Sequence, residues 1–316
     1  MAKTSHDDFI QSAEYEPERF FVPSSLLSIN DAINDRRGFQ SGRMLELVGD
    51  ESTGKSTLAL DLIANTQKLF PSECIYVDVE RSFDIKYARS LGVELSTLKI
   101  VRADSAESSL ETAEILSRRG AKIIVIDSVS FLVPRSHNEY DAGDTDVELD
   151  YEKSKKIAAL GTLLGDWVKK MVPVIDYHNT LLVFINQYRS NFSTMARVEK
   201  KPYGPRTYRH ALTWRLELAR VSNEDKRTTV HAKCTKNRLG AERGMAKYDI
   251  IYGKGLDIKG DLLKYAVEAG IVTKSGAWYY FDKDLPTQIR AQGLENATEL
   301  FDFDLIRKRL YELNMV

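Results

Sequence analysis

The feature of this sequence that most constrains its fold is the segment Gly49–Ser56, which has the form GxxxxGK[ST]. The apolar run Met44–Val48 before it is typical of a short buried strand, and Thr57–Ile63 after it has the apolar spacing of a helix. Glycines between a strand and a helix let successive backbone N–H groups point at one anion, and the helix dipole adds a positive field. The segment therefore predicts a phosphate-binding loop and a bound nucleoside triphosphate.

Two side chains of this loop have specific expected roles. Lys55 can place a positive charge between the outer phosphates, and the Ser56 hydroxyl can be a ligand of Mg²⁺. The alternative is a glycine-rich turn that carries a surface lysine. The strand before the loop and the helix after it disfavour that alternative, because a chance match has no reason to occur in this context.

Composition excludes several classes of protein. Apolar residues make up 43% and charged residues 29% of the 316 residues, as in ordinary globular proteins, and the net charge of −1 means that any nucleic-acid site is local. Cys74 and Cys234 both lie in apolar runs, so we expect them to be buried and reduced. The N-terminal residues are polar and acidic, and no apolar run has the length of a membrane span. We expect a cytoplasmic protein without a membrane partner.

Short apolar runs alternate with helical patterns along the first two thirds of the chain. Strands are expected at Met44–Val48, Cys74–Val79, Lys122–Asp127 and Leu181–Asn186, and helices at Thr57–Phe70, Tyr87–Leu91, Ser108–Arg118 and Tyr151–Met171. This alternation predicts an α/β fold with a mainly parallel central sheet covered on both faces.

Two further regions flank this core. Trp214–Leu218, Thr228–Cys234 and Lys247–Tyr252 are expected to add a meander to the sheet edge, and Asp261–Ala269, Trp278–Phe281 and Asn296–Leu313 a small helix–strand–helix unit. We expect an N-terminal segment at residues 1–35, a core at 36–255 and a small C-terminal domain at 256–316. The N-terminal segment is expected to contact another subunit.

Polar side chains stand at the carboxyl ends of the expected parallel strands, where open sheets bind ligands. Asp127 is expected to anchor Mg²⁺, and Glu80 to act as a general base on the attacking water. Gln187 can hydrogen-bond a γ-phosphate, which suits a sensor of nucleotide. The alternative for Glu80 and Asp127 is that they cap the helices that follow.

The loop is followed by further motifs in a fixed order. They are Asp78-Val79-Glu80, Asp84-Ile85-Lys86-Tyr87-Ala88-Arg89, Ile124–Val129, Phe184-Ile185-Asn186-Gln187-Tyr188-Arg189 and Lys236-Asn237-Arg238. Together with Gly49–Thr57, they resemble the RecA-type homologous recombinases, phage-encoded members in particular. The resemblance extends from about Ser25 to about Leu313, and Asp50 departs from it by replacing a proline of the family's loop.

This resemblance implies residue roles. It implies nucleotide contacts at Gly49, Glu51, Ser52, Thr53, Gly54, Lys55, Ser56, Thr57, Asp84, Tyr87 and Asp127, with Tyr87 stacking on adenine and Ser56 and Asp127 serving Mg²⁺. It implies a catalytic set of Lys55, Glu80, Gln187, Lys236 and Arg238. In this reading Lys236 and Arg238 reach the ATP of a neighbouring subunit, whereas their alternative by composition is a solvated basic turn.

The segment after Gln187 interleaves basic and aromatic side chains, a pattern typical of single-strand binding by charge neutralisation and base stacking. The expected DNA-binding residues are Arg189, Phe192, Arg197, Lys200, Lys201, Arg206 and Arg209, and Tyr188, Tyr203 and Tyr208 lie among them. The alternative is a solvated surface loop. A second DNA loop of the family corresponds to residues 138–150, which here are acidic, and Lys153, Lys155 and Lys156 after it can substitute.

The resemblance implies an ATP- and Mg²⁺-dependent DNA recombinase with a RecA-like P-loop ATPase core. Its implied partners are single-stranded DNA, double-stranded DNA, further copies of the chain in a head-to-tail helical filament, and single-strand-binding and loader proteins. Two alternatives stay open: a mediator with the same core that assembles another filament, and a hexameric helicase motor. The small C-terminal domain argues against the helicase.

Overall fold

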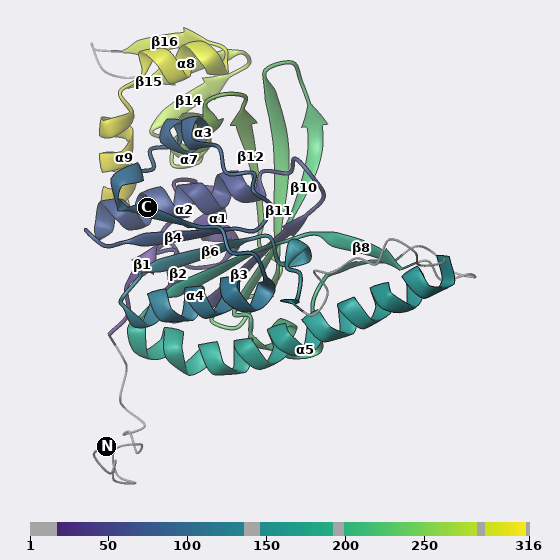
Figure 1. Ribbon diagram of the computed structural model, residues 1–316. Coiled ribbons are helices and arrows are strands. Elements are labelled where there is room, and N and C mark those ends of the chain that lie inside the picture. The colour runs from purple at the N-terminus through teal and green to yellow at the C-terminus, as the bar shows by residue number, and fades with distance from the viewer. Residues whose placement is uncertain (1–17, 136–145, 192–198, 283–287, 314–316) are drawn as a thin grey trace.

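The computed structural model describes residues 18–135, 146–191, 199–282 and 288–313. In these residues one large sheet forms the centre of the molecule, with the strand order β13-β12-β11-β10-β3-β7-β6-β4-β5 (Figure 1). Its strands are β3 (Met44–Gly49), β4 (Cys74–Asp78), β5 (Leu98–Val101), β6 (Ile123–Asp127), β7 (Leu181–Asn186), β10 (Trp214–Asn223), β11 (Arg227–Asn237), β12 (Met245–Ile251) and β13 (Gly255–Leu256). The strands from β10 to β5 pair in parallel, and β11, β12 and β13 add antiparallel strands at the edge. The predicted α/β fold is confirmed.

Helices cover both faces of this sheet, which is why its parallel strands are almost wholly apolar. The α-helices of the described residues, in chain order, are α1 (Leu27–Ala32), α2 (Lys55–Leu69), α3 (Ile85–Ser90), α4 (Ala106–Arg118), α5 (Asp146–His178), α6 (Arg206–Ala211), α7 (Ile258–Glu268), α8 (Leu294–Leu300) and α9 (Phe303–Glu312), of which α8 and α9 belong to the C-terminal region. Side chains of α1 and α2 pack on one face, and those of α4 and α5 on the other. Strand β3, which leads into the phosphate-binding loop, is therefore held from both sides.

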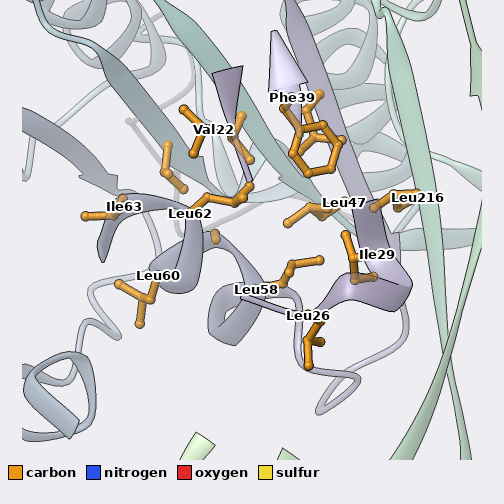
Figure 2. Packing of buried hydrophobic residues seen from close by; sticks show 14 of the residues in the cluster. Val22, Leu26, Ile29, Phe39, Leu47, Leu58, Leu60, Leu62, Ile63 and Leu216 are labelled. Atoms are coloured by element: carbon orange, nitrogen blue, oxygen red, sulfur yellow. The ribbon is translucent and has the colours of Figure 1, made fainter. Parts of the chain in front are cut away.

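The face covered by α1 and α2 carries the larger core cluster, part of which Figure 2 shows around Leu47 of β3 and Leu58 of α2. The two-stranded sheet of β1 (Phe21–Val22) and β2 (Phe39–Gln40) closes its end. There the rings of Phe39 and Trp214 meet edge to face, with centroids 5.4 Å apart. Because Leu47 is fully buried at this interface, the helix after the loop cannot shift without disturbing the core.

Helix α5 is longer at both ends than the predicted Tyr151–Met171. Pro173 lies inside it, although a proline removes one helix hydrogen bond and usually ends a helix. The helix continues because Val174 and Ile175, just beyond the proline, are buried against the sheet. The predicted acidic loop therefore ends before Asp146, and residues 136–145 lie outside the described residues. In Figure 1 the first half of α5 projects from the body beside β8 (Tyr188–Asn191).

The C-terminal region has its own small core, built on the antiparallel sheet of β14 (Val272–Ser275), β15 (Trp278–Phe281) and β16 (Ile289–Gln292). The predicted single helix Asn296–Leu313 is wrong, because the chain forms α8 and α9 with a break between them. Phe301 turns into the core, and the Asp302 carboxylate then accepts the N–H groups of Asp304 and Leu305 as a new helix cap.

Several short strands were not predicted. Strand β5 lies at the sheet edge, and only Leu98 of its four residues is buried, so its apolar signal is weak. Apart from Tyr188 and Pro202, the hairpin of β8 and β9 (Glu199–Pro202) is polar. The domain limits at residues 35 and 255 stay a prediction.

Both cysteines are buried and unpaired, as predicted. Burial raises the pKa of the Cys74 thiol to about 12 and that of the Cys234 thiol to about 11, so neither is a thiolate near neutral pH. Among the described residues, no helix combines the length and the apolar character needed to cross a bilayer.

The core around β3 predicts a strong positional dependence of stability. Leu47→Ala should lower the free energy of unfolding by about 2–5 kcal/mol, because it leaves a cavity under the central strand. Leu69→Ala, on the half-exposed last turn of α2, should change the free energy of unfolding by less than about 0.5 kcal/mol. Urea unfolding of both variants measures the difference, and equal losses would show that the cluster is not the stabilising core.

Candidate nucleotide and DNA site

The phosphate-binding loop joins the end of β3 to the start of α2 and is shaped by two glycines. Gly54 has φ +84°, and a Cβ atom there would lie 2.3 Å from Cδ1 of Ile250. A Cβ atom on Gly49 would lie 2.4 Å from the Leu218 carbonyl oxygen. At Gly49 the backbone approaches β10 too closely for a side chain, and at Gly54 the positive φ favours glycine. The loop therefore has a fixed shape before any ligand binds.

Lys55 is buried within this loop. Its Nζ atom donates hydrogen bonds to the carbonyl oxygens of Gly49, at 3.0 Å, and Asp50, at 2.7 Å. Burial lowers the pKa of Lys55, although the carboxylates of Asp127 and Glu80 act in the opposite sense. The ammonium group is thus held at the loop. A bound phosphate would give it a negatively charged partner in place of the neutral carbonyl oxygens.

The carboxylate of Asp127, at the end of β6, lies against the first turn of α2. Its Oδ2 atom accepts a hydrogen bond from Ser56 Oγ, at 2.8 Å, and another from the Tyr76 hydroxyl. Burial raises the pKa of Asp127, and both hydrogen bonds act against that rise. A hydroxyl and a carboxylate held together are oxygen ligands of the kind that Mg²⁺ takes beside phosphates, so Ser56 and Asp127 could hold the ion directly or through water.

Glu80 and Gln187 come from neighbouring regions of the sheet edge and meet there. Glu80 Oε1 accepts a hydrogen bond from Ser128 Oγ and lies 3.5 Å from Nε2 of Gln187. Partial burial raises the pKa of Glu80, and Asp127 adds to that rise. A carboxylate with a raised pKa is a stronger base, and Glu80 is partly exposed, so water can reach it. The peptide bond between Asp127 and Ser128 is cis.

Helix α3 carries the two residues expected at adenine. Asp84 caps this helix, because its Oδ1 atom accepts the N–H groups of Lys86 and Tyr87. The hydroxyl groups of Tyr87 and Thr57 lie 2.9 Å apart and share a hydrogen bond. Tyr87 is therefore fixed beside the first turn of α2, next to the loop. The adenine contact itself stays a prediction.

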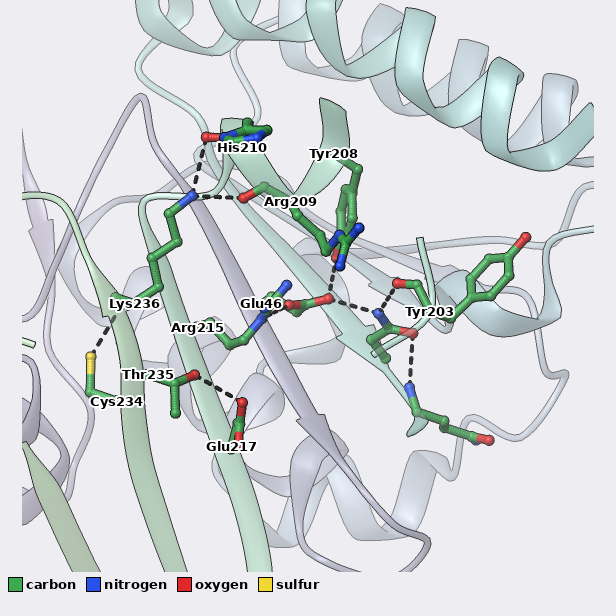
Figure 3. A network of polar contacts seen from close by, with 12 residues as sticks. Glu46, Tyr203, Tyr208, Arg209, His210, Arg215, Glu217, Cys234, Thr235 and Lys236 are labelled. Carbon is green, nitrogen blue, oxygen red and sulfur yellow. Dashed lines mark hydrogen bonds and ion pairs between the residues drawn. The ribbon is translucent and has the colours of Figure 1, made fainter. Parts of the chain in front are cut away.

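Lys236 and Arg238 lie at the end of β11 and are directed at α6. Lys236 Nζ donates to the carbonyl oxygens of Arg209, at 2.7 Å, and His210, at 3.1 Å (Figure 3). Arg238 also donates to the His210 carbonyl. Burial and the charge of Arg238 lower the pKa of Lys236 to about 8. The two cations thus rest on the C-terminal carbonyl groups of α6, where a helix attracts positive charge.

The expected DNA-binding residues fall into two groups. Lys201, Arg206 and Arg209 are exposed, the last two on α6. Phe192 and Arg197 lie outside the described residues, as do the side chains of Arg189 and Lys200.

The aromatic side chains of this segment differ from the expectation of base stacking. Tyr208 is fully buried and Tyr203 is 7% exposed, so neither ring is available to a base. Tyr208 instead packs edge to face on Phe184 of β7, with ring centroids 5.0 Å apart. The spacing of aromatic and basic residues in the sequence cannot tell buried rings from exposed ones. Here α6 packs one of its sides against the body of the molecule, and Tyr208 lies on that side.

Three partners at this site were not expected from the sequence. Tyr76 bonds to Asp127, Ser128 bonds to Glu80, and Glu46 lies fully buried in β3 beneath the loop. The sequence does not indicate the contact of Tyr76, because a tyrosine in an apolar strand is typical of the core. It does mark Glu46 as unusual, because Glu46 is the single charged residue of Met44–Gly49. Such a residue has to find partners when its strand is buried on both faces.

Comparison with known proteins covers nearly the whole chain. A family model for the RecA N-terminal domain matches residues 14–257, and one for the RecA C-terminal domain matches residues 260–303. Protein RecA of Salinispora tropica is 36% identical over 288 residues, which are 89% of this chain and 78% of that protein. Protein RecA of Rhodospirillum rubrum is 36% identical over 268 residues, 83% of this chain and 69% of that protein. The chain therefore belongs to the RecA family.

Proposed function

We propose that this chain is an ATP-dependent DNA recombinase, which assembles on single-stranded DNA and exchanges strands with a homologous duplex. Membership of the RecA family supports DNA recombination and repair coupled to ATP hydrolysis. The observation that carries the proposal is that Lys55, Glu80 and Gln187 converge at the sheet edge where the DNA-binding segment begins. One edge thus holds the groups for hydrolysis and the start of the DNA segment.

ATP would be bound by the loop and hydrolysed with Glu80 as base. Lys55 offsets the charge of the outer phosphates, and Ser56 and Asp127 hold Mg²⁺, which when bound neutralises developing phosphate charge. Glu80 accepts the proton of the attacking water. Gln187 lies within reach of Glu80, so its amide can report whether a γ-phosphate is present.

Assembly would use Lys236 and Arg238 in trans. Lys236 is opposite Arg215 in β10, and Arg215 is opposite Glu46 in β3, three residues before Gly49. At about 3.3 Å per strand residue, the backbone of Lys236 lies roughly 10 Å short of the loop along the strands. This distance supports a role for Lys236 and Arg238 at the ATP of the next subunit. Repetition of such a head-to-tail interface gives a helical filament when the subunits do not close into a ring.

DNA contact would come mainly from the segment Tyr188–His210, which includes Arg189, Phe192, Arg197, Lys200 and most of α6. The exposed charges of Lys201, Arg206 and Arg209 support this assignment. The segment starts directly at Gln187, so a change at the γ-phosphate is next to it in the chain. The lysines of α5 after the acidic residues are the competing contact.

Three finer points stay predictions: a phage-type subclass, single-strand-binding and loader proteins as partners, and the cytoplasm as location. The mediator and the ring helicase are not favoured by the family match. Electron microscopy with single-stranded DNA and a non-hydrolysable ATP analogue distinguishes the three. A helical filament supports the recombinase, a closed ring the helicase, and the absence of assembly a mediator.

Glu80→Gln should retain ATP and DNA binding but lower DNA-stimulated ATP turnover about 10²–10⁴-fold, the usual size of a general-base effect. Since the pKa of Glu80 is raised, wild-type turnover should fall as the pH drops through that pKa and the base becomes protonated. A phosphate-release assay from pH 5 to 8 measures both effects. Turnover of Glu80→Gln equal to that of the wild type would refute the assignment.

Mixing inactive subunits tests the trans role. Lys236→Ala/Arg238→Ala subunits mixed with Lys55→Ala subunits should regain some turnover, because one junction then joins an intact loop to intact cations. Mixing Lys55→Ala with Glu80→Gln should give none, since no junction has an intact loop side. Equal results for the two mixtures, with folding and co-assembly verified, would argue for a role in cis.

Salt dependence tests the DNA segment. Arg206→Ala and Arg209→Ala should each lower the salt slope of single-strand binding by about 0.7 if the side chain contacts a phosphate. Phe192→Ala should weaken binding by about 1–3 kcal/mol of lost stacking without changing the slope. Lys99→Ala on β5, paired with Glu73 at the far sheet edge, is the control.

The competing contact has its own set of variants in the same assay. A lower slope only after substitution of Lys153, Lys155 and Lys156 would assign the main contact to α5. Melting curves of Phe192→Ala separate loss of stacking from loss of folding.

A further inference from the structure

A fully buried carboxylate lies in β3, the strand that leads into the phosphate-binding loop. Glu46, in the middle of β3, uses both of its oxygen atoms (Figure 3). Oε1 accepts a hydrogen bond from Asn186 Nδ2, at 2.7 Å, and one from the Tyr208 hydroxyl, at 2.9 Å. Oε2 forms an ion pair with Arg215. These four residues, here called the Glu46 network, come from β3, β7, α6 and β10.

The Asn186 side chain extends the Glu46 network to the nucleotide sensor. Its Nδ2 atom also donates to the Tyr203 carbonyl, at 2.6 Å, and its Oδ1 atom accepts the N–H group of Gln187, at 2.9 Å. The Gln187 carbonyl in turn accepts the N–H group of Tyr203, at 3.3 Å. The start of the DNA-binding segment is thereby tied to Tyr203, just before α6, and to β3.

Helix α6, the last part of that segment, is held at two places. Tyr208 anchors its buried side to Glu46, and burial together with Glu46 raises the pKa of this hydroxyl well above its usual value, so it stays a donor. Lys236 and Arg238 bind the carbonyl groups at its end. A shift of α6 would therefore disturb both the strand under the loop and the cations expected in trans.

Stability alone is a weak reason for such a network. A buried ion pair loses hydration, and well-packed apolar residues of similar volume are often at least as stable. Arg215 also keeps a buried Nη2 atom without a partner among the described residues. The Glu46 network instead fixes the relative positions of β3, β7, α6 and β10, because buried polar groups with directed hydrogen bonds allow only one arrangement of the elements that they join.

We propose that Glu46 and Tyr208 are positioning residues, which hold Gln187 and α6 in a fixed relation so that nucleotide at the loop alters the DNA-binding segment. This inference rests on the proposed function. It goes beyond it by assigning the coupling to a buried network that contacts neither ATP nor DNA. Tyr208→Phe removes one hydroxyl and keeps the ring that packs on Phe184, which makes it the sharpest probe.

The experiment measures coupling in both directions. The first quantity is the factor by which a non-hydrolysable ATP analogue with Mg²⁺ strengthens binding of a labelled oligothymidylate. The second is the factor by which the oligonucleotide strengthens binding of the analogue, and the two factors must be equal. In Tyr208→Phe both should fall roughly tenfold or more, the effect of one lost hydrogen bond to a charged group. In Glu46→Gln both should fall at least as far, because the carboxylate charge that pairs with Arg215 is also lost. Affinity for the analogue without DNA should change little.

Tyr248→Phe is the matched control. Tyr248, in β12, is also a fully buried tyrosine, and its hydroxyl has no partner among the described residues. Tyr248→Phe should leave both factors unchanged. Its melting temperature shows how much stability the chain loses when a buried hydroxyl is removed, for comparison with Tyr208→Phe. A double variant tests the route: Tyr208→Phe added to Gln187→Ala should have no further effect on coupling, because Tyr208 acts through the position of Gln187.

The outcomes separate this inference from the proposed function. If the wild type shows no strengthening of DNA binding by the analogue, the proposed function fails. If the wild type shows it and Tyr208→Phe and Glu46→Gln retain it, the inference is overturned. It is also overturned if these variants weaken DNA binding equally with and without the analogue, or if their effect adds to that of Gln187→Ala.

Discussion

The parallel pairing of β3, β7, β6 and β4 is the constraint on which the rest of the structure depends. Parallel strands in register end at one edge of the sheet, and here Val48 pairs with Asn186 and Asp78 with Asp127. The loop after β3, Glu80 after β4, Asp127 after β6 and Gln187 after β7 are therefore neighbours, although they are far apart in the chain. The apolar faces of these strands, packed under α2 and α5, keep that edge in place.

Electrostatics at this edge follow from burial more than from net charge. The chain has almost equal numbers of acidic and basic residues, yet Lys55, Asp127 and Glu80 all have shifted pKa values, because each is removed from water. Hydrogen bonds from Tyr76 and Ser128 to the two carboxylates partly offset these shifts. The site thus keeps a lysine and two carboxylates close together, and the charges of a bound triphosphate and Mg²⁺ would shift the pKa values of all three again.

Much of this arrangement could be predicted from the sequence. Residues such as Gly54 and Asp127 were identified because glycine spacing and strand-end carboxylates have local physical causes. What could not be predicted depends on tertiary packing. Tyr208 has the same local signal as an exposed DNA-stacking ring, and only its burial on Phe184 separates the two. Similarly, α5 continues through Pro173 because of contacts that lie elsewhere in the chain, and the polar strands β8 and β9 have no apolar pattern to find.

Lys236 and Arg238 rest on α6, away from the loop of their own chain, and this separation makes the two ends of an assembly chemically different. At one terminus the last subunit would hold ATP without cations from a neighbour, and at the other terminus the last subunit would present cations without ATP to receive them. Turnover would thus be a property of junctions, so that a chain of subunits always has one silent site. Addition and loss of subunits would differ between the two termini for that reason alone, without any difference between the subunits themselves.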